Sequence, residues 1–281
     1  MLEKVYGVIG CPISHSMSPE MHNDLFEYYS LDARYHAFHV ENEDLEAAIK
    51  GFRALGVSGF NITIPHKVAV MSYIDEIEEV AANIGAVNTV VNNNGKLIGY
   101  NTDGDGYLMS LKPKVTKDLK ECHVLIIGAG GAARGIFISM AAKGIKHIDI
   151  CNRTVGRAEE LIKDCQYETF AKGLTFSQAE EILSRYDIIV NTTSVGMHPN
   201  VDEIPISLDH LTSNTVVSDI IYNPIKTKLL QEAEKRGATI DTGIGMFVNQ
   251  GALAFEKWTD IFPDTTRMEK VVVRRLGGTT C

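Results

Sequence analysis

The sequence predicts a two-domain α/β protein, and three observations lead to that prediction. The chain has 281 residues, close to twice the roughly 150 residues of an average domain. Short apolar runs typical of β-strands alternate with helical patterns along most of its length, which indicates mainly parallel sheets. The alternation pauses where Gly104, Gly106 and Pro113 cluster, and then it starts again. We therefore place a domain boundary near residues 103–115.

The first hundred residues predict a sheet built largely from strand–helix–strand units. Ser18 and Pro19 start the first helix in the preferred way, with Ser18 at the N-cap and Pro19 at the first helical position. The turn at 92–95 indicates a hairpin, and so an antiparallel piece at one edge of the sheet. The expected strands are 5–9, 35–40, 59–64, 86–91 and 96–100, and the expected helices are 18–28, 44–55 and 74–84.

The second half alternates more regularly, which favours a parallel sheet covered by helices on both faces. The last forty residues are predicted to be helical, most clearly at 246–261. The expected strands are 123–127, 147–151, 187–191, 216–220 and 239–241. The expected helices are one that follows the segment 128–134 and ends near 143, and 157–164, 177–184 and 225–236.

Composition excludes several classes of protein. With 36 acidic and 27 basic residues the net charge is −9, which argues against a nucleic-acid or anionic-membrane partner. No apolar run approaches the roughly 18 residues of a membrane span, and the first residues lack an apolar core of signal-peptide length. The five cysteines show no C-x-x-C spacing, so we expect reduced thiols, no metal and a cytoplasmic location.

A glycine-rich turn points to a nucleotide. Gly128-x-Gly130-x-x-Ala133 follows a predicted strand directly and opens a predicted helix. Gly130 and Gly131 carry no Cβ, so a pyrophosphate can approach the backbone N–H groups at the positive end of the helix. The alternative is a plain turn in a chain with 24 glycines, and the strand–turn–helix context favours the nucleotide.

The end of the next strand indicates which nucleotide. An NAD site usually carries an acidic residue there, for the ribose 2′-hydroxyl. This chain has Asn152, Arg153 and Thr154 instead, with Arg157 one helical turn later. Guanidinium groups suit a 2′-phosphate, because they present a planar donor fork and a permanent charge. A solvated basic helix start is the other interpretation, but cations there oppose the helix dipole. We therefore predict NADP as the cofactor.

Polar side chains in the first half suggest a small-molecule site. Ser14, Ser16 and Ser18 precede a helix N-terminus, where hydroxyl and N–H donors can hold a carboxylate. In the segment 61–67, Asn61, Thr63 and Lys67 alternate with apolar residues at the end of a strand, where ligands of α/β proteins bind. Asn88 lies in another short strand and is either a satisfied core amide or a reader of hydroxyl groups.

Taken together, these motifs resemble the shikimate dehydrogenase family. The matching segments follow one another from residue 5 to about residue 260, nearly the whole chain. They are Ser-x-Ser-Pro-x-x-His-Asn at 16–23, Asn-Ile-Thr-Ile-Pro-His-Lys at 61–67, Gly-Ala-Val-Asn-Thr at 85–89, Asn-Thr-Asp-Gly at 101–104, Gly-Ala-Gly-Gly-Ala at 128–132, Asn-Arg-Thr at 152–154 and Gly-x-Gly-Met-x-x-x-Gln at 243–250.

The resemblance implies an NADPH-dependent, reversible reduction of 3-dehydroshikimate to shikimate, a step of the shikimate pathway towards aromatic amino acids. It implies that Lys67 and Asp103 flank the reacting oxygen as catalytic residues. Since an ammonium group can supply the proton that the oxygen needs, our hypothesis is that Lys67 is the general acid of reduction and the base of alcohol oxidation. The implied substrate-binding residues are Ser16, Ser18, Asn61, Thr63, Lys67, Asn88, Asp103, Tyr222 and Gln250. The implied cofactor-binding residues are Gly128, Ala129, Gly130, Gly131, Ala132, Asn152, Arg153, Thr154, Arg157, Ile220, Gly243 and, with less around it that is distinctive, Glu79.

The resemblance also completes the predicted organisation. Residues 1–104 with 244–281 are expected to form the substrate-binding domain and residues 105–243 a Rossmann-type NADP-binding domain, with the site between them. The C-terminal helices return to the first domain because Gln250 has to reach the substrate. The oligomeric state is expected to be a monomer or homodimer.

Two alternatives stay open at this point. One is a quinate/shikimate dehydrogenase that prefers NAD and accepts an extra ring hydroxyl. Arg153 and Arg157 argue against the preference for NAD. The other is a non-catalytic ligand-binding sensor with the same fold, which would be expected to lack Lys67 or Asp103. Both residues are present, so the enzyme is favoured.

Overall fold

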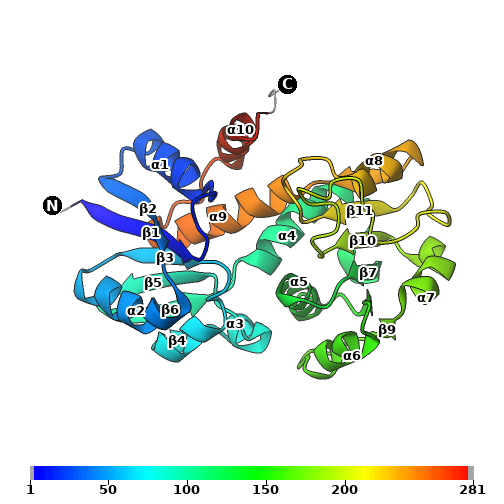
Figure 1. Ribbon diagram of the computed structural model, residues 1–281, viewed down its shortest axis with the longest axis horizontal. Helices are drawn as coiled ribbons and strands as arrows, with labels where there is room; N and C mark the ends of the chain where they lie inside the picture. Colours follow the sequence, from blue (N-terminus) through cyan, green and yellow to red (C-terminus); the bar gives the residue numbers. More distant parts are fainter. Residues whose placement is uncertain (1–2, 278–281) are drawn as a thin grey trace. The chain divides into compact units, whose positions relative to one another are not determined.

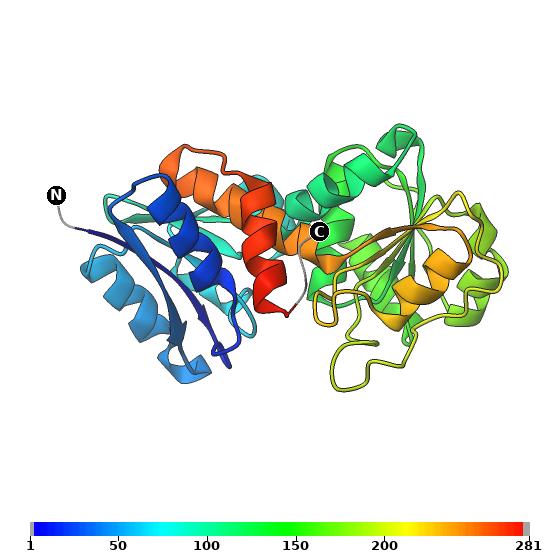
Figure 2. The same cartoon turned by 90° about the horizontal axis from the view of Figure 1, so that it is seen from above.

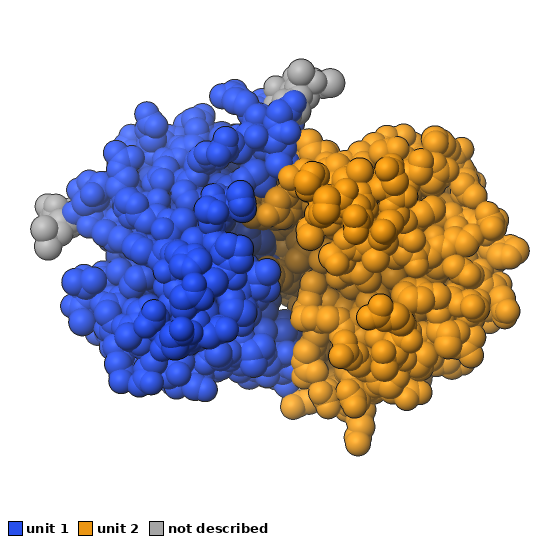
Figure 3. All heavy atoms as spheres, viewed as in Figure 1, with its two compact units in different colours: residues 1–102, 250–281 blue, residues 103–249 orange. Residues whose placement is uncertain are grey.

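The computed structural model describes residues 3–277, and the chain divides into two compact units. One comprises residues 1–102 and 250–281, and the other residues 103–249 (Figure 3). Residues 1–2 and 278–281 of the predicted first domain lie outside the described residues. The mixed α/β class and the mainly parallel sheets are confirmed. The assignment of substrate to one unit and cofactor to the other stays a prediction.

The first unit is a six-stranded sheet in the order β2-β1-β3-β5-β6-β4 (Figure 1). Only β5 runs antiparallel to its two neighbours, and it lies inside the sheet rather than at the predicted edge. The strands are β1 (Lys4–Gly10), β2 (Ala33–His39), β3 (Gly59–Ile62), β4 (Glu76–Ile77), β5 (Thr89–Asn93) and β6 (Lys96–Tyr100). The helices are α1 (Ser18–Tyr28), α2 (Leu45–Ala54), α3 (Glu79–Ile84), α10 (Thr265–Arg275), η1 (Asn42–Asp44) and η2 (Ala69–Tyr73).

Helix α10 packs beside α1, at the opposite end of the sequence (Figures 1 and 2). Arg267 forms a bidentate ion pair with Asp24 at 2.5 and 2.8 Å, which fixes this pairing. Helix α9 (Gly243–Thr259) starts in the second unit and ends in the first. Its Trp258 donates Nε1–H to the Val90 carbonyl at 3.0 Å, and so anchors the helix on β5.

The second unit is an all-parallel sheet in the order β9-β8-β7-β10-β11-β12 (Figure 1). Numbered within this unit, the order is 3-2-1-4-5-6, the doubly wound order of dinucleotide-binding domains. The strands are β7 (His123–Ile127), β8 (His147–Cys151), β9 (Gly173–Leu174), β10 (Ile188–Asn191), β11 (Val216–Asp219) and β12 (Thr239–Asp241). The helices are α4 (Asp103–Leu111), α5 (Gly131–Ala142), α6 (Val155–Lys163), α7 (Phe176–Glu181), α8 (Lys228–Lys235), η3 (Lys112–Lys114), η4 (Leu119–Glu121) and η5 (Leu183–Arg185).

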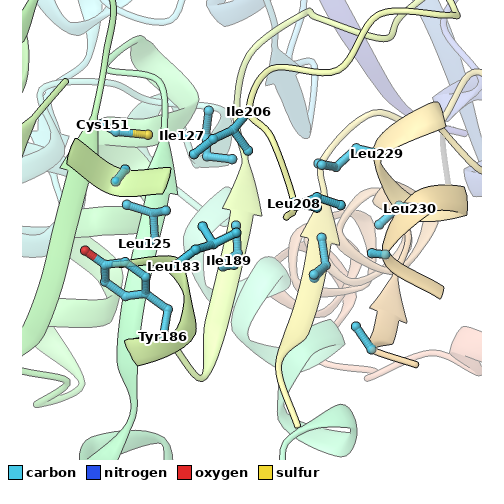
Figure 4. Packing of buried hydrophobic residues seen from close by; sticks show 14 of the residues in the cluster. Leu125, Ile127, Cys151, Leu183, Tyr186, Ile189, Ile206, Leu208, Leu229 and Leu230 are labelled. Atoms are coloured by element: carbon cyan, nitrogen blue, oxygen red, sulfur yellow. The ribbon is translucent and has the colours of Figure 1, made fainter. Parts of the chain in front are cut away.

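The core of the second unit explains why its inner strands are apolar on both faces. Figure 4 shows Leu125 and Ile127 of β7 and Ile189 of β10 packed with Leu229 and Leu230 of α8. All five side chains are at most 1% exposed. A parallel strand flanked by helices on both sides has no face left for water, so alternation gives way to a continuous apolar run.

Three local predictions are wrong. Met17, not Ser18, is the N-cap of α1, and the Ser18 side chain is buried instead. The predicted helix 74–84 contains the short edge strand β4, and only α3 is helical there. Gly104 and Gly106 lie inside α4 rather than in a linker, and a Cβ on Gly104 would come within 2.0 Å of Ser139 Oγ on α5. Glycine is therefore needed for close helix packing at a position that resembled a break.

In the region from residue 3 to residue 277, no helix is long and apolar enough to cross a membrane.

Candidate functional site

The serine turn of the first unit leads into α1. Ser16 and Ser18 are held together because the Ser18 N–H donates to Ser16 Oγ at 3.3 Å. Ser16 is half-buried and Ser18 is buried, and Ser18 lies within hydrogen-bonding reach of Tyr35 on β2. Burial raises the pKa of Tyr35 well above its usual range, so its hydroxyl keeps its proton and acts as a donor. The turn is thereby connected to the sheet.

A chain of buried hydrogen bonds starts at that tyrosine. The Tyr35 hydroxyl donates to Asn61 Oδ1 at 2.7 Å, and Asn61 Nδ2 donates to Thr89 Oγ1 at 3.0 Å and to the Asn88 carbonyl at 3.1 Å. Both ends of the Asn61 amide are thus used by protein partners. Since Asn61 is only 7% exposed, its geometry suits a positioning role.

The chain continues from Thr89 to the start of the C-terminal segment. Thr89 Oγ1 donates to Asn88 Oδ1 at 2.9 Å, and Asn88 Nδ2 donates to Thr102 Oγ1 at 3.1 Å. Thr102 Oγ1 donates in turn to the Gln250 carbonyl at 3.0 Å. The Thr102 hydroxyl also lies 3.2 Å from Asn88 Oδ1, so its single proton is shared between two acceptors. The backbone N–H of Thr102 also donates to Asn88 Oδ1 at 2.8 Å, directly before Asp103.

Thr63 and Lys67 lie on the segment that follows β3. The Thr63 N–H donates to the Ile9 carbonyl at 3.0 Å, which extends the pairing of β3 with β1 by one residue. The Lys67 carbonyl accepts from the Val87 N–H at 2.8 Å, so this segment is also tied to the residue before Asn88. Both side chains are half-buried. Strand β3 ends at Ile62, so Thr63 and Lys67 lie on the turns that follow the carboxyl end of the strand rather than on one face of it.

The glycine-rich turn in the second unit has the geometry of a phosphate cradle. Gly128 adopts φ +106°, and a Cβ there would lie 2.8 Å from Thr192 Oγ1, so no other residue fits. Gly130 is the N-cap of α5, and a Cβ on Gly130 or Gly131 would meet nothing within 4 Å. The helix N-terminus is therefore open to a ligand. It borders a pocket of ≈ 350 Å³ whose lining includes Arg157.

The end of β8 carries the predicted cationic groups. Asn152 Nδ2 donates to the Thr154 carbonyl at 2.8 Å and shapes the turn into α6. Arg153 and Arg157 are exposed, and within residues 3–277 neither takes part in an ion pair. Arg134 lines the same pocket from α5 and pairs with Asp164 at 2.9 Å. The exposed guanidinium group of Arg157 borders the same pocket as the open helix N-terminus, and Arg153 lies four residues earlier, which makes the end of β8 a suitable place for a phosphorylated ligand.

Asp219 is the last residue of β11 and orders the turn that follows this strand. It accepts hydrogen bonds from Thr227 Oγ1 at 2.7 Å, from Asn191 Nδ2 at 3.2 Å and from the Ile221 N–H at 3.0 Å. Burial raises the pKa of Asp219 to about 6, against these three donors, which lower it. The network holds the turn that carries Ile220 and Tyr222.

Gly243 packs against this turn, since a Cβ there would come within 2.3 Å of the Ile220 carbonyl oxygen. The Tyr222 ring lies 5.2 Å from that of Phe247. Helix α9 therefore fixes the backbone of Ile220 and the ring of Tyr222.

The structure thus gathers the predicted residues in two sets. The first unit contains Ser16, Ser18, Asn61, Thr63, Lys67, Asn88, Gln250 and Glu79, with Glu79 at the start of α3. The second contains Asp103, Gly128, Ala129, Gly130, Gly131, Ala132, Asn152, Arg153, Thr154, Arg157, Ile220, Tyr222 and Gly243.

Sequence reasoning missed Tyr35, Thr89, Thr102 and Arg134. Thr89 and Thr102 lie in the matched segments 85–89 and 101–104, where attention went to Asn88 and Asp103. Tyr35 lies outside the matched segments, and its partner Asn61 is 26 residues away. Arg134 could have been found, because it lies one helical turn after Gly130.

These features define a two-domain α/β protein with a doubly wound nucleotide-binding unit and a second, mixed unit. Three family models match the chain. They are the shikimate dehydrogenase substrate binding domain over residues 8–90, shikimate / quinate 5-dehydrogenase over 110–220, and the shikimate 5′-dehydrogenase C-terminal domain over 243–273.

Individual proteins agree with the family models. A protein of Geobacillus sp. (strain WCH70) named shikimate dehydrogenase (NADP(+)) is 57% identical over 99% of this chain and 100% of its own length. A crystal structure of a shikimate dehydrogenase in complex with NADP⁺ is 41% identical over 98% of both chains, with a TM-score of 0.90. The shikimate 5-dehydrogenase of Thermus thermophilus, in complex with NADP(H) and shikimate, is 33% identical over 98% of this chain and 100% of its own, with a TM-score of 0.87. The chain belongs to the shikimate dehydrogenase family.

Proposed function

We propose that the protein catalyses the reversible, NADPH-dependent reduction of 3-dehydroshikimate to shikimate. One observation of the structure carries the proposal. A one-way chain of hydrogen bonds joins Tyr35, beside the serine turn, through Asn61 and Asn88 to Gln250, and so connects four motifs from separate parts of the sequence. Relatives that are 57% and 53% identical over 99% of the chain carry the name shikimate dehydrogenase (NADP(+)), which supports the reaction.

The substrate is a small carboxylate with ring hydroxyls, and the chain offers a suitable group for each. We propose that Ser16 and Ser18 hold the carboxylate at the start of α1, where backbone N–H groups add to the favourable field. Thr63, Asn88, Tyr222 and Gln250 are assigned to the hydroxyls. Asn61 is assigned a positioning role, because its amide is already satisfied by Tyr35 and Thr89.

When bound, NADPH supplies a hydride to the carbonyl carbon of the substrate. The oxygen then gains negative charge and takes a proton, and we assign that proton to the ammonium group of Lys67. In the oxidative direction the neutral Lys67 amine takes the proton back. The Asp103 carboxylate accepts a hydrogen bond from the reacting hydroxyl and orients it. The backbone N–H of the preceding Thr102 is fixed on Asn88, which supports a defined position for Asp103.

The cofactor assignment rests on the turn after β7 and the end of β8. The pyrophosphate is assigned to the N–H groups at Gly128–Ala132, and the adenosine 2′-phosphate to Arg153, Arg157 and Thr154. Residues 152–154 include no acidic side chain, and two exposed guanidinium groups follow the strand, which supports NADP over NAD. Ile220 and Gly243 are assigned to the nicotinamide end, and Glu79 to a lesser contact from α3.

The first experiment measures NADP⁺ reduction with shikimate, beside quinate and beside NAD⁺. Fast turnover only with shikimate and NADP⁺ is the expected result. Comparable turnover with quinate or NAD⁺ would move the protein to the broader-specificity relatives, and shikimate binding without turnover would favour a sensor. Light scattering on the same sample tests the monomer or homodimer that we expect, and cell fractionation tests the cytoplasmic location.

The role of Lys67 has its own test. Lys67→Met keeps the length of the side chain and removes the proton, so kcat is expected to fall by about 10²–10⁴-fold. Lys50→Met is a matched control, because Lys50 lies on α2 and pairs with the exposed Glu46. Turnover of Lys67→Met at the control's rate would contradict the assignment.

A further inference from the structure

Three side chains of the first unit form a cluster that the proposed reaction does not use. Cys11 follows β1, His39 is the last residue of β2, and Glu41 lies two residues further on. The Cys11 thiol donates to Glu41 Oε2 at 3.2 Å, and Cys11 Sγ lies 3.6 Å from His39 Nε2. His39 Nε2 lies 2.8 Å from Glu41 Oε1. One ligand atom from each residue lies within 4.8 Å of the other two.

The sheet explains why these residues meet. Gly10 of β1 is the register partner of His39 in β2, so Cys11 lies beside the residues that follow His39. Val40 is buried, and in an extended chain its neighbours His39 and Glu41 point together to the opposite side. Two hydrogen bonds fix Val40, with its N–H donating to the Gly10 carbonyl at 3.2 Å and its carbonyl 2.6 Å from Nε2 of the buried His66. The backbone that carries His39 and Glu41 is therefore held in place at the end of the edge strand β2.

We propose that Cys11, His39 and Glu41 form a binding site for a thiophilic divalent cation, with zinc as the best-fitting ion. At the usual Zn–S, Zn–N and Zn–O bond lengths, a tetrahedral ion separates its ligand atoms by about 3.3–3.6 Å. Cys11 Sγ and His39 Nε2 already lie 3.6 Å apart, within that range. Glu41 Oε1 lies 2.8 Å from Nε2 and Oε2 lies 3.2 Å from Sγ, so a small rotation of the carboxylate can bring one oxygen to a suitable distance from both. A thiolate, a carboxylate and a neutral imidazole also balance the +2 charge of the ion.

The donor set decides which cation it takes. Magnesium and calcium prefer oxygen ligands only, whereas a sulfur, nitrogen and oxygen set suits zinc and its neighbours in the first transition series. All three side chains are at least partly exposed, so water can complete the coordination. The spacing gave no zinc signal in the sequence, because Cys11 lies 28 and 30 residues before its partners.

The cluster is poorly suited to act as a redox switch instead. Glu41 accepts the thiol hydrogen bond and thereby raises the pKa of Cys11, which keeps the sulfur protonated and weakly nucleophilic.

The test uses the whole protein with zinc and with cobalt as the probes. Titration calorimetry of wild type with Zn²⁺ should show one site per chain, with affinity reduced at least tenfold in Cys11→Ser and in His39→Gln. Co²⁺ should produce a thiolate-to-cobalt charge-transfer absorption that Cys11→Ser abolishes. Cys165→Ser is the matched control, because Cys165 is a partly buried free cysteine of the second unit and should retain both signals.

Each outcome decides the proposal. At least tenfold weaker zinc binding and loss of the cobalt absorption in Cys11→Ser, with the control unchanged and the circular dichroism of all variants alike, support it. Absence of stoichiometric binding in the wild type, or a smaller loss of affinity in Cys11→Ser, overturns it. Because the readout is binding and absorption, neither result depends on dehydrogenase activity.

Discussion

Replacing His22 should remove much of the acid sensitivity of the first unit. His22 lies on α1, is fully buried, and finds no hydrogen-bond partner for either ring nitrogen among residues 3–277. Its ring stacks on Tyr35 at 4.6 Å and faces Phe255 at 6.2 Å. Such surroundings favour the neutral ring, and burial lowers the pKa of His22 to about 3.

The size of the effect follows from that shift. The pKa of His22 in the folded chain lies below its unfolded value of 6.5, so below pH 6.5 the unfolded state binds a proton that the native state does not. The associated stability is complete above pH 6.5 and is lost as the pH falls. At about 1.4 kcal/mol per pH unit, the loss reaches about 2 kcal/mol at pH 5 and about 5 kcal/mol near pH 3.

The assay compares urea unfolding at pH 7.5 and at pH 5 in wild type and in His22→Phe. Trp258 is the only tryptophan of the chain and lies 5.4 Å from His22, so its fluorescence reports unfolding of this unit. Any cost of the larger phenyl ring appears at both pH values and cancels in the difference. We expect that difference to shrink by about 2 kcal/mol in His22→Phe.

A matched control replaces a histidine that water already surrounds. His36 lies on β2 of the same unit and is exposed, so His36→Phe should keep the wild-type difference between the two pH values. If His22→Phe also keeps the full wild-type difference, His22 is not a buried neutral group and the reasoning fails.

Further predictions concern the two hydrogen-bond networks and the glycine turn. Tyr35→Phe removes the donor to Asn61 and leaves a buried oxygen unpaired, so unfolding followed by Trp fluorescence should show a loss of about 1–3 kcal/mol. Gly128→Ala should destabilise the second unit by about 1–2 kcal/mol in circular-dichroism melts, because of its φ of +106°. Gly130→Ala should leave stability unchanged and weaken NADPH binding in titrations, because only a ligand would meet the new Cβ. Burial raises the pKa of Asp219 to about 6, so between about pH 4 and pH 6 the folded state binds a proton that the unfolded state has lost. The stability that this proton contributes is present below about pH 4 and is lost as the pH rises through 6. Asp219→Asn should remove this loss, about 3 kcal/mol in pH-dependent melts, and an unchanged pH profile would contradict it.

The sequence predicted the second unit well because its signals are local. Strand β8 was predicted with its observed limits, and Gly128 and Gly130 follow β7 as a dinucleotide turn requires. The alternation of strands and helices needs only neighbours in sequence to be visible. The prediction failed at Gly104, because the close approach of α5 requires glycine there and nothing in the neighbouring sequence indicates that contact.

In the candidate site of the first unit, too, the local sequence did not show contacts between distant segments. Asn61 and Asn88 were visible as polar residues in apolar strands, but not what satisfies them. Their partners Tyr35, Thr89 and Thr102 are ordinary residues in local sequence, and only the sheet brings them together. Sequence can therefore identify the side chains of such a site, while their orientation depends on pairings between distant segments.

The buried hydrogen-bond chain also affects Asp103 and the side chain of Gln250, which are not part of it. Each asparagine amide is held in one orientation by a backbone group, because Asn61 Nδ2 donates to the Asn88 carbonyl and Asn88 Oδ1 accepts from the Thr102 N–H. The Tyr35 hydroxyl supplies the donor for Asn61 Oδ1 at the other end. The run ends at the Gln250 carbonyl and also holds the Thr102 N–H, one residue before Asp103. Removing Tyr35 at the far end should therefore disturb Asp103 and Gln250 as well as the serine turn. In that case Tyr35→Phe raises KM for shikimate and lowers kcat together, whereas a purely local defect at the serine turn would raise KM alone.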